Sequence, residues 1–202
     1  MRVTTEAIVL GLHKRTDKLS VLQVYTEQEG MLQLQVYGAN GKKKSHAAYM
    51  PLAVVEVTYD LPPTRPIGVI SSIETIYLPE QVYADVRRQA IAFFVAEIIT
   101  ITLTHPLQDK QTYNYLRSFI QELNDTPTPE NTHLLFLVRM AELLGIGTPP
   151  MADNQDSDVI TRLPLNRTQR QEHLRTLCDW YHTHIETFRI PKSLDVLIEV
   201  FD

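Results

Sequence analysis

Apolar and polar residues alternate with a period of two in the first eighty residues of the chain. The clearest run is 31–37, where Leu32, Leu34 and Val36 alternate with polar residues. Successive side chains of a strand point to opposite faces, so this run predicts one buried face and one wet face. Further β-rich runs occupy residues 5–12, 19–26, 52–59 and 67–76, and the turns between them are too short for crossover helices. The sequence therefore predicts a five-stranded antiparallel barrel of the OB type over residues 1–80.

The apolar pattern changes to a helical period after residue 80. Helices are predicted over residues 83–103, 109–123, 130–144, 168–188 and 192–201. The first is apolar over most of its circumference, including Val86 and Phe93, which predicts a helix central to a core. Gly145 is expected to cap the third, and the proline-rich, then acidic stretch 147–158 is expected to be an exposed connector. The predicted fold class is α+β, with an all-β OB-type barrel followed by an all-α helical domain at 81–202.

Charge is distributed unevenly along the chain. The net charge is −5, yet residues 1–50 contain seven Lys and Arg against four Asp and Glu. Residues 51–202 contain twelve against twenty. A basic amino-terminal block followed by an acidic remainder predicts one anion-facing part and one part with a different role.

Cysteine content and hydropathy predict the compartment. The single cysteine, Cys178, excludes an internal disulfide framework and a four-cysteine zinc site within the chain. No apolar run approaches the roughly 20 residues that cross a bilayer, and the first residues show no signal-peptide cleavage pattern. We therefore expect a cytoplasmic protein with no membrane segment.

Basic residues gather in two predicted connections of the barrel. Lys14, Arg15 and Lys18 occupy the turn between the first two strands, and Lys42 to Lys44 follow the third strand. Lysines beside an exposed aromatic residue are typical of proteins that bind single-stranded nucleic acid. A solubilising hairpin tip is the alternative, and charge and position alone favour neither. The candidate nucleic-acid-binding residues are Lys14, Arg15, Lys18, Tyr37, Lys42, Lys43 and Lys44.

Motifs that would support an enzyme are absent from the sequence. There is no G-x-S-x-G nucleophile motif and no glycine-rich phosphate loop of the nucleotide-binding types. Cys178 and His182 share a helix face, but no second ligand pair lies nearby, so they are interpreted as a core cysteine and a surface histidine. The helical carboxylates Glu97, Glu122 and Glu142 are interpreted as solvated faces or caps. No catalytic residue, metal or cofactor is predicted.

A series of motifs resembles the bacterial RecO family of recombination mediators. In order they are AIVL at 7–10, the basic turn at 13–18, TEQEG at 26–30, YGANGKKKS at 37–45 and PL at 51–52. The helical segments HLLFLVRMAELLGIGTPP and HIETFRIPKSLDVLIEVF are similar to later parts of the same family. Many members carry a four-cysteine zinc insertion after the L-G-x-x-P segment. This chain has the short, cysteine-free stretch 147–158 there instead.

The resemblance implies a non-enzymatic mediator of DNA repair and recombination, associated with the nucleoid. Such a protein would bind single- and double-stranded DNA, anneal complementary strands and contact the acidic tail of single-stranded-DNA-binding protein. With RecR, it would help to load RecA. Arg87, Arg88 and Arg139 are candidates for receiving the acidic tail. The alternative is a protein-interaction scaffold that recruits repair partners without touching DNA, which the acidic net charge favours.

Overall fold

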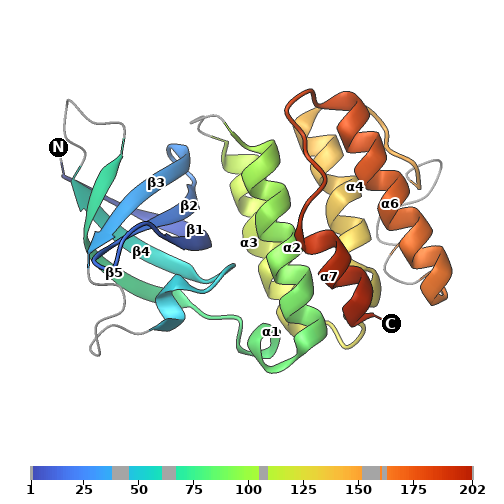
Figure 1. The fold of residues 1–202 in the computed structure, drawn as a ribbon, viewed down its shortest axis with the longest axis horizontal. Coiled ribbons are helices and arrows are strands. Elements are labelled where there is room, and N and C mark those ends of the chain that lie inside the picture. The colour runs from blue at the N-terminus through green and yellow to red at the C-terminus, as the bar shows by residue number, and fades with distance from the viewer. Residues whose placement is uncertain are drawn as a thin grey trace. The chain divides into compact units, whose positions relative to one another are not determined.

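The computed structural model describes residues 2–37, 46–60, 67–104, 109–151, 160 and 163–201. Its strands are β1 (Arg2–Lys14), β2 (Leu19–Thr26), β3 (Gly30–Tyr37), β4 (Val54–Asp60) and β5 (Gly68–Tyr77). Its helices are α1 (Glu80–Ala84), α2 (Val86–Thr102), α3 (Lys110–Asp125), α4 (Thr132–Leu144), α6 (Arg167–His184) and α7 (Ser193–Val200), with short 3₁₀ turns η1 (His46–Tyr49) and η2 (Pro129–Asn131). Strands come first and helices follow, so the predicted α+β class is confirmed (Figure 1). Most of the predicted connector 147–158 lies outside the described residues.

In the described part of the chain, five strands form a closed barrel in the order β1-β2-β3-β5-β4. Neighbouring strands are antiparallel except β3 and β5, which pair in parallel at Leu34 with Gly68 and Gln35 with Val69. The predicted five-stranded barrel of the OB type is therefore confirmed, and the parallel pairing of β3 with β5 is its one departure from the predicted antiparallel arrangement. Strand directions cannot alternate around a ring with an odd number of members, so one pair must be parallel. This order is the OB arrangement.

The interior of the barrel confirms the alternation predicted for β3. Leu34 and Val36 are each 1% exposed and Leu32 packs against the same core, whereas Gln33 and Tyr37 are exposed. The other buried core residues are Ala7, Val9, Leu22, Val24, Ala48, Tyr49, Ala53, Val55, Val57 and Tyr59. One face of each strand thus supplies the core.

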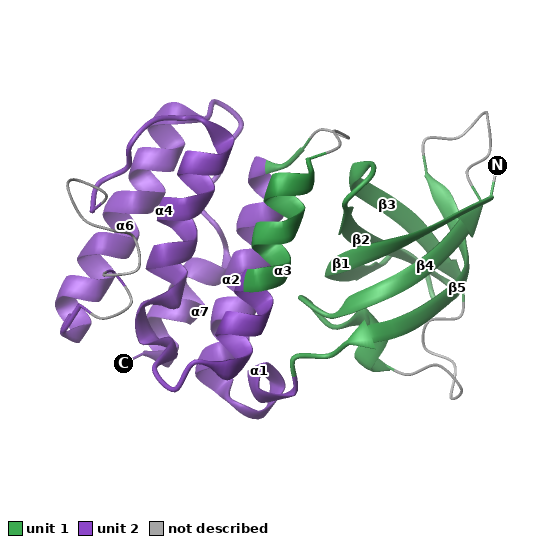
Figure 2. Ribbon diagram, turned by 180° about the vertical axis from the view of Figure 1, so that it is seen from behind, with its two compact units in different colours: residues 1–79, 103–118 green, residues 80–102, 119–202 purple. Residues whose placement is uncertain are grey.

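The chain forms two compact units, residues 1–79 with 103–118 and residues 80–102 with 119–202 (Figure 2). Within the first unit, the early turns of α3 contact the outer face of β1 and β2. The Tyr113 hydroxyl donates to Glu6 Oε1 at 2.8 Å, and Arg117 Nε lies 3.0 Å from the same oxygen. The rings of Tyr113 and Tyr25 stack with centroids 6.4 Å apart. The outer face of the barrel is therefore partly covered within its own unit.

Helix α4 is the most buried helix of the second unit, with every residue from Thr132 to Val138 buried. The prediction that the first long helix would be central to a core is confirmed for α2, although Val86 is 64% and Phe93 is 52% exposed. Its buried residues are spread around most of the helix and are Ala90, Ile91, Ala92, Phe94, Val95, Ala96, Ile98 and Ile99. The cap at Gly145 is confirmed by its left-handed φ of 64°.

Two predicted helices have different bounds in the structure. The run 83–103 is divided at Asp85, whose carboxylate accepts a hydrogen bond from Arg87 N at 2.8 Å and so caps the start of α2. The run 168–188 ends at His184, and its start is capped by Asn166, which exchanges two 3.0 Å hydrogen bonds with Gln169. No helix among the described residues is long and apolar enough to span a membrane.

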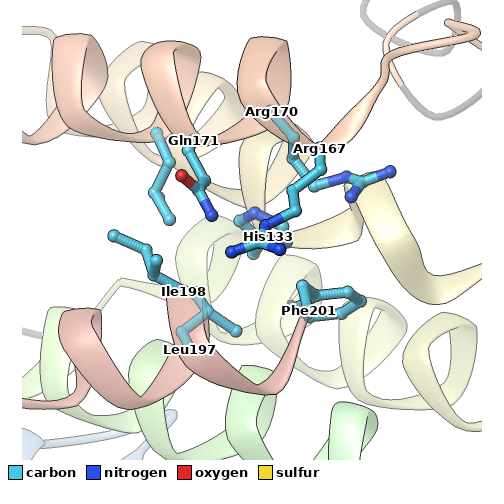
Figure 3. A pocket seen from close by; sticks show the side chains of 8 residues that line it. His133, Arg167, Arg170, Gln171, Leu197, Ile198 and Phe201 are labelled. Carbon is cyan, nitrogen blue, oxygen red and sulfur yellow. The ribbon is translucent and has the colours of Figure 1, made fainter.

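The core of the second unit, called the helical unit below, contains a fully buried histidine. His133 is 1% exposed, and neither of its ring nitrogens has a hydrogen-bond partner among the described residues. Figure 3 shows Arg167 and Arg170 reaching toward it from α6, with Leu197, Ile198 and Phe201 opposite. The cavity here measures about 10 Å³, enough for about one water molecule. Burial first, and then the charge of Arg170, lowers the pKa of His133 from 6.5 to about 3.

We expect Gly68→Ala to destabilise the protein by about 1–3 kcal/mol in urea unfolding, because overpacking a filled core is costly. A Cβ at Gly68 would lie 2.9 Å from the side chains of both Leu34 and Tyr59, inside the barrel. Gly11→Ala is the matched control, since a Cβ there lies 3.4 Å from the exposed His13 ring. Its effect should stay within about 0.5 kcal/mol. Equal effects of the two substitutions would contradict close packing of Leu34 and Tyr59 around Gly68.

We expect acid to destabilise the helical unit through His133. Its pKa is lowered to about 3 in the fold, so below pH 6.5 the unfolded chain binds a proton that the folded chain does not. Stability is full above pH 6.5 and falls by about 2 kcal/mol from this group between pH 7 and pH 5. In urea unfolding at these two pH values, His133→Leu should remove that difference, whereas the exposed His184→Gln should keep it. An unchanged pH difference in His133→Leu would refute the assignment.

Candidate nucleic-acid interface

The basic turn between β1 and β2 is an ordered hairpin tip. Arg15 N and Thr16 N donate to the carbonyl of Leu19 at 2.9 and 3.0 Å, and Leu19 N donates to Thr16 Oγ1 at 3.1 Å. The side chains of Lys14, Arg15 and Lys18 are exposed on this turn. Lys14 pairs with Asp17 at 2.8 Å, but these side chains are 59% and 95% exposed, so the pair is weak and open to competition by another anion.

Tyr37 lies at the same end of the sheet as the basic turn. It ends β3 directly opposite Leu19, the first residue of β2 after the turn. Its side chain is 55% exposed, and its hydroxyl donates to Gln35 Oε1 at 3.3 Å on the same face of the strand. The structure therefore brings four of the predicted residues, Lys14, Arg15, Lys18 and Tyr37, to one end of the barrel. Lys42, Lys43 and Lys44 lie outside the described residues and follow Tyr37 by five to seven positions in the sequence.

An open hollow lies on the outer face of β1, β2 and β3 beside this turn. It is lined by His13, Lys14, Arg15, Val21, Gln23 and Gln33. The strand register sets His13 opposite Val21 and Gln23 opposite Gln33, so the lining comes from two cross-strand pairs. His13 and Gln23 were not among the predicted site residues. The outward positions of β2 could have indicated Gln23, because Leu22 and Val24 on either side of it face the core.

Arg88 has a structural role at the end of α3. Its side chain is 12% exposed, and its guanidinium donates to the carbonyls of Leu123, Asn124 and Thr126. These carbonyls lie at the end of α3, where no further turn supplies donors. The guanidinium of Arg88 therefore caps a helix and has little exposed area for a ligand.

Arg87 and Arg139 are more exposed and belong to separate ion pairs. Arg87 Nη1 lies 3.5 Å from Glu130, and Arg139 Nη1 lies 3.1 Å from Glu142. Their side chains are 51% and 37% exposed. Each arginine thus has its own acidic neighbour, which a peptide carboxylate would have to displace.

The residues considered for catalysis or metal binding have structural partners. Cys178 is buried, which raises the pKa of its thiol to about 12, and His182 Nδ1 donates to the Phe188 carbonyl at 3.1 Å. Glu97 accepts hydrogen bonds from Lys192 N and Ser193 N at 2.9 Å each and caps the start of α7, as predicted for a helix carboxylate. The described residues contain no group of three His, Cys, Asp or Glu side chains placed to hold a metal.

Comparison with known proteins gives matches along most of the chain. Residues 1–79 match the family model described as recombination protein O N terminal, and residues 83–149 match recombination protein O C terminal. The DNA repair protein RecO of Bacteroides fragilis is 26% identical over 239 residues, covering 98% of each chain. Those of Flavobacterium johnsoniae and Porphyromonas gingivalis are 21% and 23% identical, covering 100% of each chain.

These alignments are longer than the 202 residues of the chain, so the relatives contain residues with no counterpart here. Both family models nevertheless match in chain order, one on the barrel and one on the helices. The chain therefore belongs to the RecO family of DNA repair and recombination proteins.

Proposed function

We propose that this chain binds single-stranded DNA through the basic end of its barrel and anneals complementary strands. The observation that carries the proposal is the gathering of exposed Lys14, Arg15 and Lys18 beside the exposed ring of Tyr37. Exposed cations suit the phosphates of a strand, and a tyrosine face suits a base. The binding residues of the proposal also include Lys42, Lys43 and Lys44, which follow Tyr37 in the sequence.

In this proposal the protein acts without catalysis, as a mediator. Together with RecR it helps RecA to load on DNA coated by single-stranded-DNA-binding protein, and it also binds duplex DNA. Membership of a DNA repair family supports this role. The barrel domain at 1–80 would hold the DNA, and the helical domain at 81–202 would receive partners.

The acidic tail of single-stranded-DNA-binding protein is proposed to contact the helical domain at exposed arginines. Arg87 and Arg139 suit this role better than Arg88, because their side chains are 51% and 37% exposed and that of Arg88 is 12% exposed. A peptide carboxylate would replace Glu130 or Glu142 as the partner of the guanidinium.

Salt dependence tests the proposed phosphate contacts. Log affinity for a single strand should fall with log salt by about 0.7 for each contact, because each neutralised phosphate releases counterions. Replacing Lys14, Arg15 and Lys18 together by alanine should flatten the slope by about 2, and so should replacing Lys42 to Lys44. Fluorescence anisotropy with a labelled oligonucleotide at several salt concentrations measures both slopes.

The control for this experiment removes cations elsewhere. Arg175 and Lys192 are exposed on the helical unit, and replacing both by alanine should leave the slope unchanged. Strand annealing, measured at two salt concentrations, should fall in the two triple variants and not in this control. A wild-type chain that binds no DNA, or a slope that neither triple variant changes, would overturn the proposal. The absence of DNA binding would favour the scaffold alternative.

A further inference from the structure

The hollow beside the basic turn combines three kinds of surface within one small area. Val21, 7% exposed, supplies an apolar floor, while the amides of Gln23 and Gln33 and the imidazole of His13 stand around it. Lys14 and Arg15 lie on its rim. Within the described part of the chain, no hydrogen bond or ion pair engages the side chains of His13, Gln23 or Gln33.

An unpaired nucleobase matches this combination. Its flat face is apolar enough to lie on an aliphatic floor, and its edge carries both donors and acceptors. A glutamine amide donates through its nitrogen and accepts through its oxygen, so a pair of glutamines can bond to the edge of any base. The phosphates of the DNA strand that carries the base would then lie along Lys14 and Arg15 on the rim.

The same chemistry excludes a base pair. In a duplex the hydrogen-bonding edges of the bases are joined to each other, and stacking covers their faces. Duplex DNA can therefore meet Lys14 and Arg15 through its phosphates but cannot fill the hollow. A site of this kind makes binding depend on unpaired bases and only weakly on which bases they are.

We infer that the hollow is a base-binding site in which Gln23 and Gln33 hydrogen-bond to one unpaired base of the DNA strand. The inference rests on the proposed function and adds to it the residues that distinguish single strands from duplexes. The cross-strand register that holds Gln23 opposite Gln33 makes the two amides one unit. Tyr37, two residues beyond Gln35 on the same face of β3, would meet a neighbouring base.

An abasic strand separates base contacts from phosphate contacts. The experiment compares the affinities for a mixed-sequence single strand and for a strand of equal length that retains the sugars and phosphates but lacks the bases. We expect the wild-type chain to bind the strand with bases about tenfold more tightly. Replacing both glutamines, Gln23→Thr with Gln33→Thr, should lower that ratio by about fivefold and leave the abasic affinity unchanged, because threonine suits a strand but is too short to reach the base.

Matched variants make each result decisive. Gln28→Thr replaces an exposed glutamine in the β2–β3 turn, at the other end of the sheet, and should keep the wild-type ratio. Circular dichroism of the double variant checks that the barrel is folded. A wild-type ratio near one would overturn the inference and leave DNA binding intact, and so would a ratio lost in Tyr37→Ala but kept in the double variant. Failure of the wild-type chain to bind either strand would overturn the proposed function as well.

Discussion

The antiparallel register of β2 and β3 is the constraint on which the candidate interface depends. Leu22 lies opposite Leu34 and Val24 opposite Leu32, so core residues meet core residues and the glutamines between them face outward. The same register sets Tyr37 opposite Leu19, next to the basic turn. A slip by one residue would expose the leucines and bury the glutamines. The packing that stabilises the barrel therefore also holds the interface together.

The outer face of the barrel changes from covered to exposed along β1. From Ala7 to Leu10 this strand is buried on both faces, and Glu6, just before them, contacts Tyr113 and Arg117 of α3. The register with β2 then shifts between Val9 and Gly11, and the strand continues to His13 and Lys14, which are exposed. An extra residue in one strand increases its local twist and redirects the side chains that follow. The bulge thus separates the covered part of the face from the part that is open to a ligand.

Local pattern predicted local structure and little beyond it. The alternation in β3 and the cap at Gly145 were read directly from neighbouring residues, and both are confirmed. The role of Arg88 could not be read in this way, because its carbonyl partners lie 35 to 38 residues further along the chain. The partner of Glu6 is 107 residues away. Periodicity contains no information about such pairs, and for the same reason it did not show that α4 is more buried than α2.

The acidic net charge does not count against a cationic site on the barrel. At physiological ionic strength the screening length is about 8 Å, so an anion near the surface responds mainly to the charges within about that distance of it. Lys14, Arg15 and Lys18 lie on one hairpin tip, with Asp17 as the acidic residue among them. The twenty acidic residues after position 50 lower the net charge of the whole chain, which is not a measure of the charge close to this tip. Acidic residues repel a polyanion, so separating the two signs of charge along the chain favours the basic end over the acidic part as the place where a polyanion would bind.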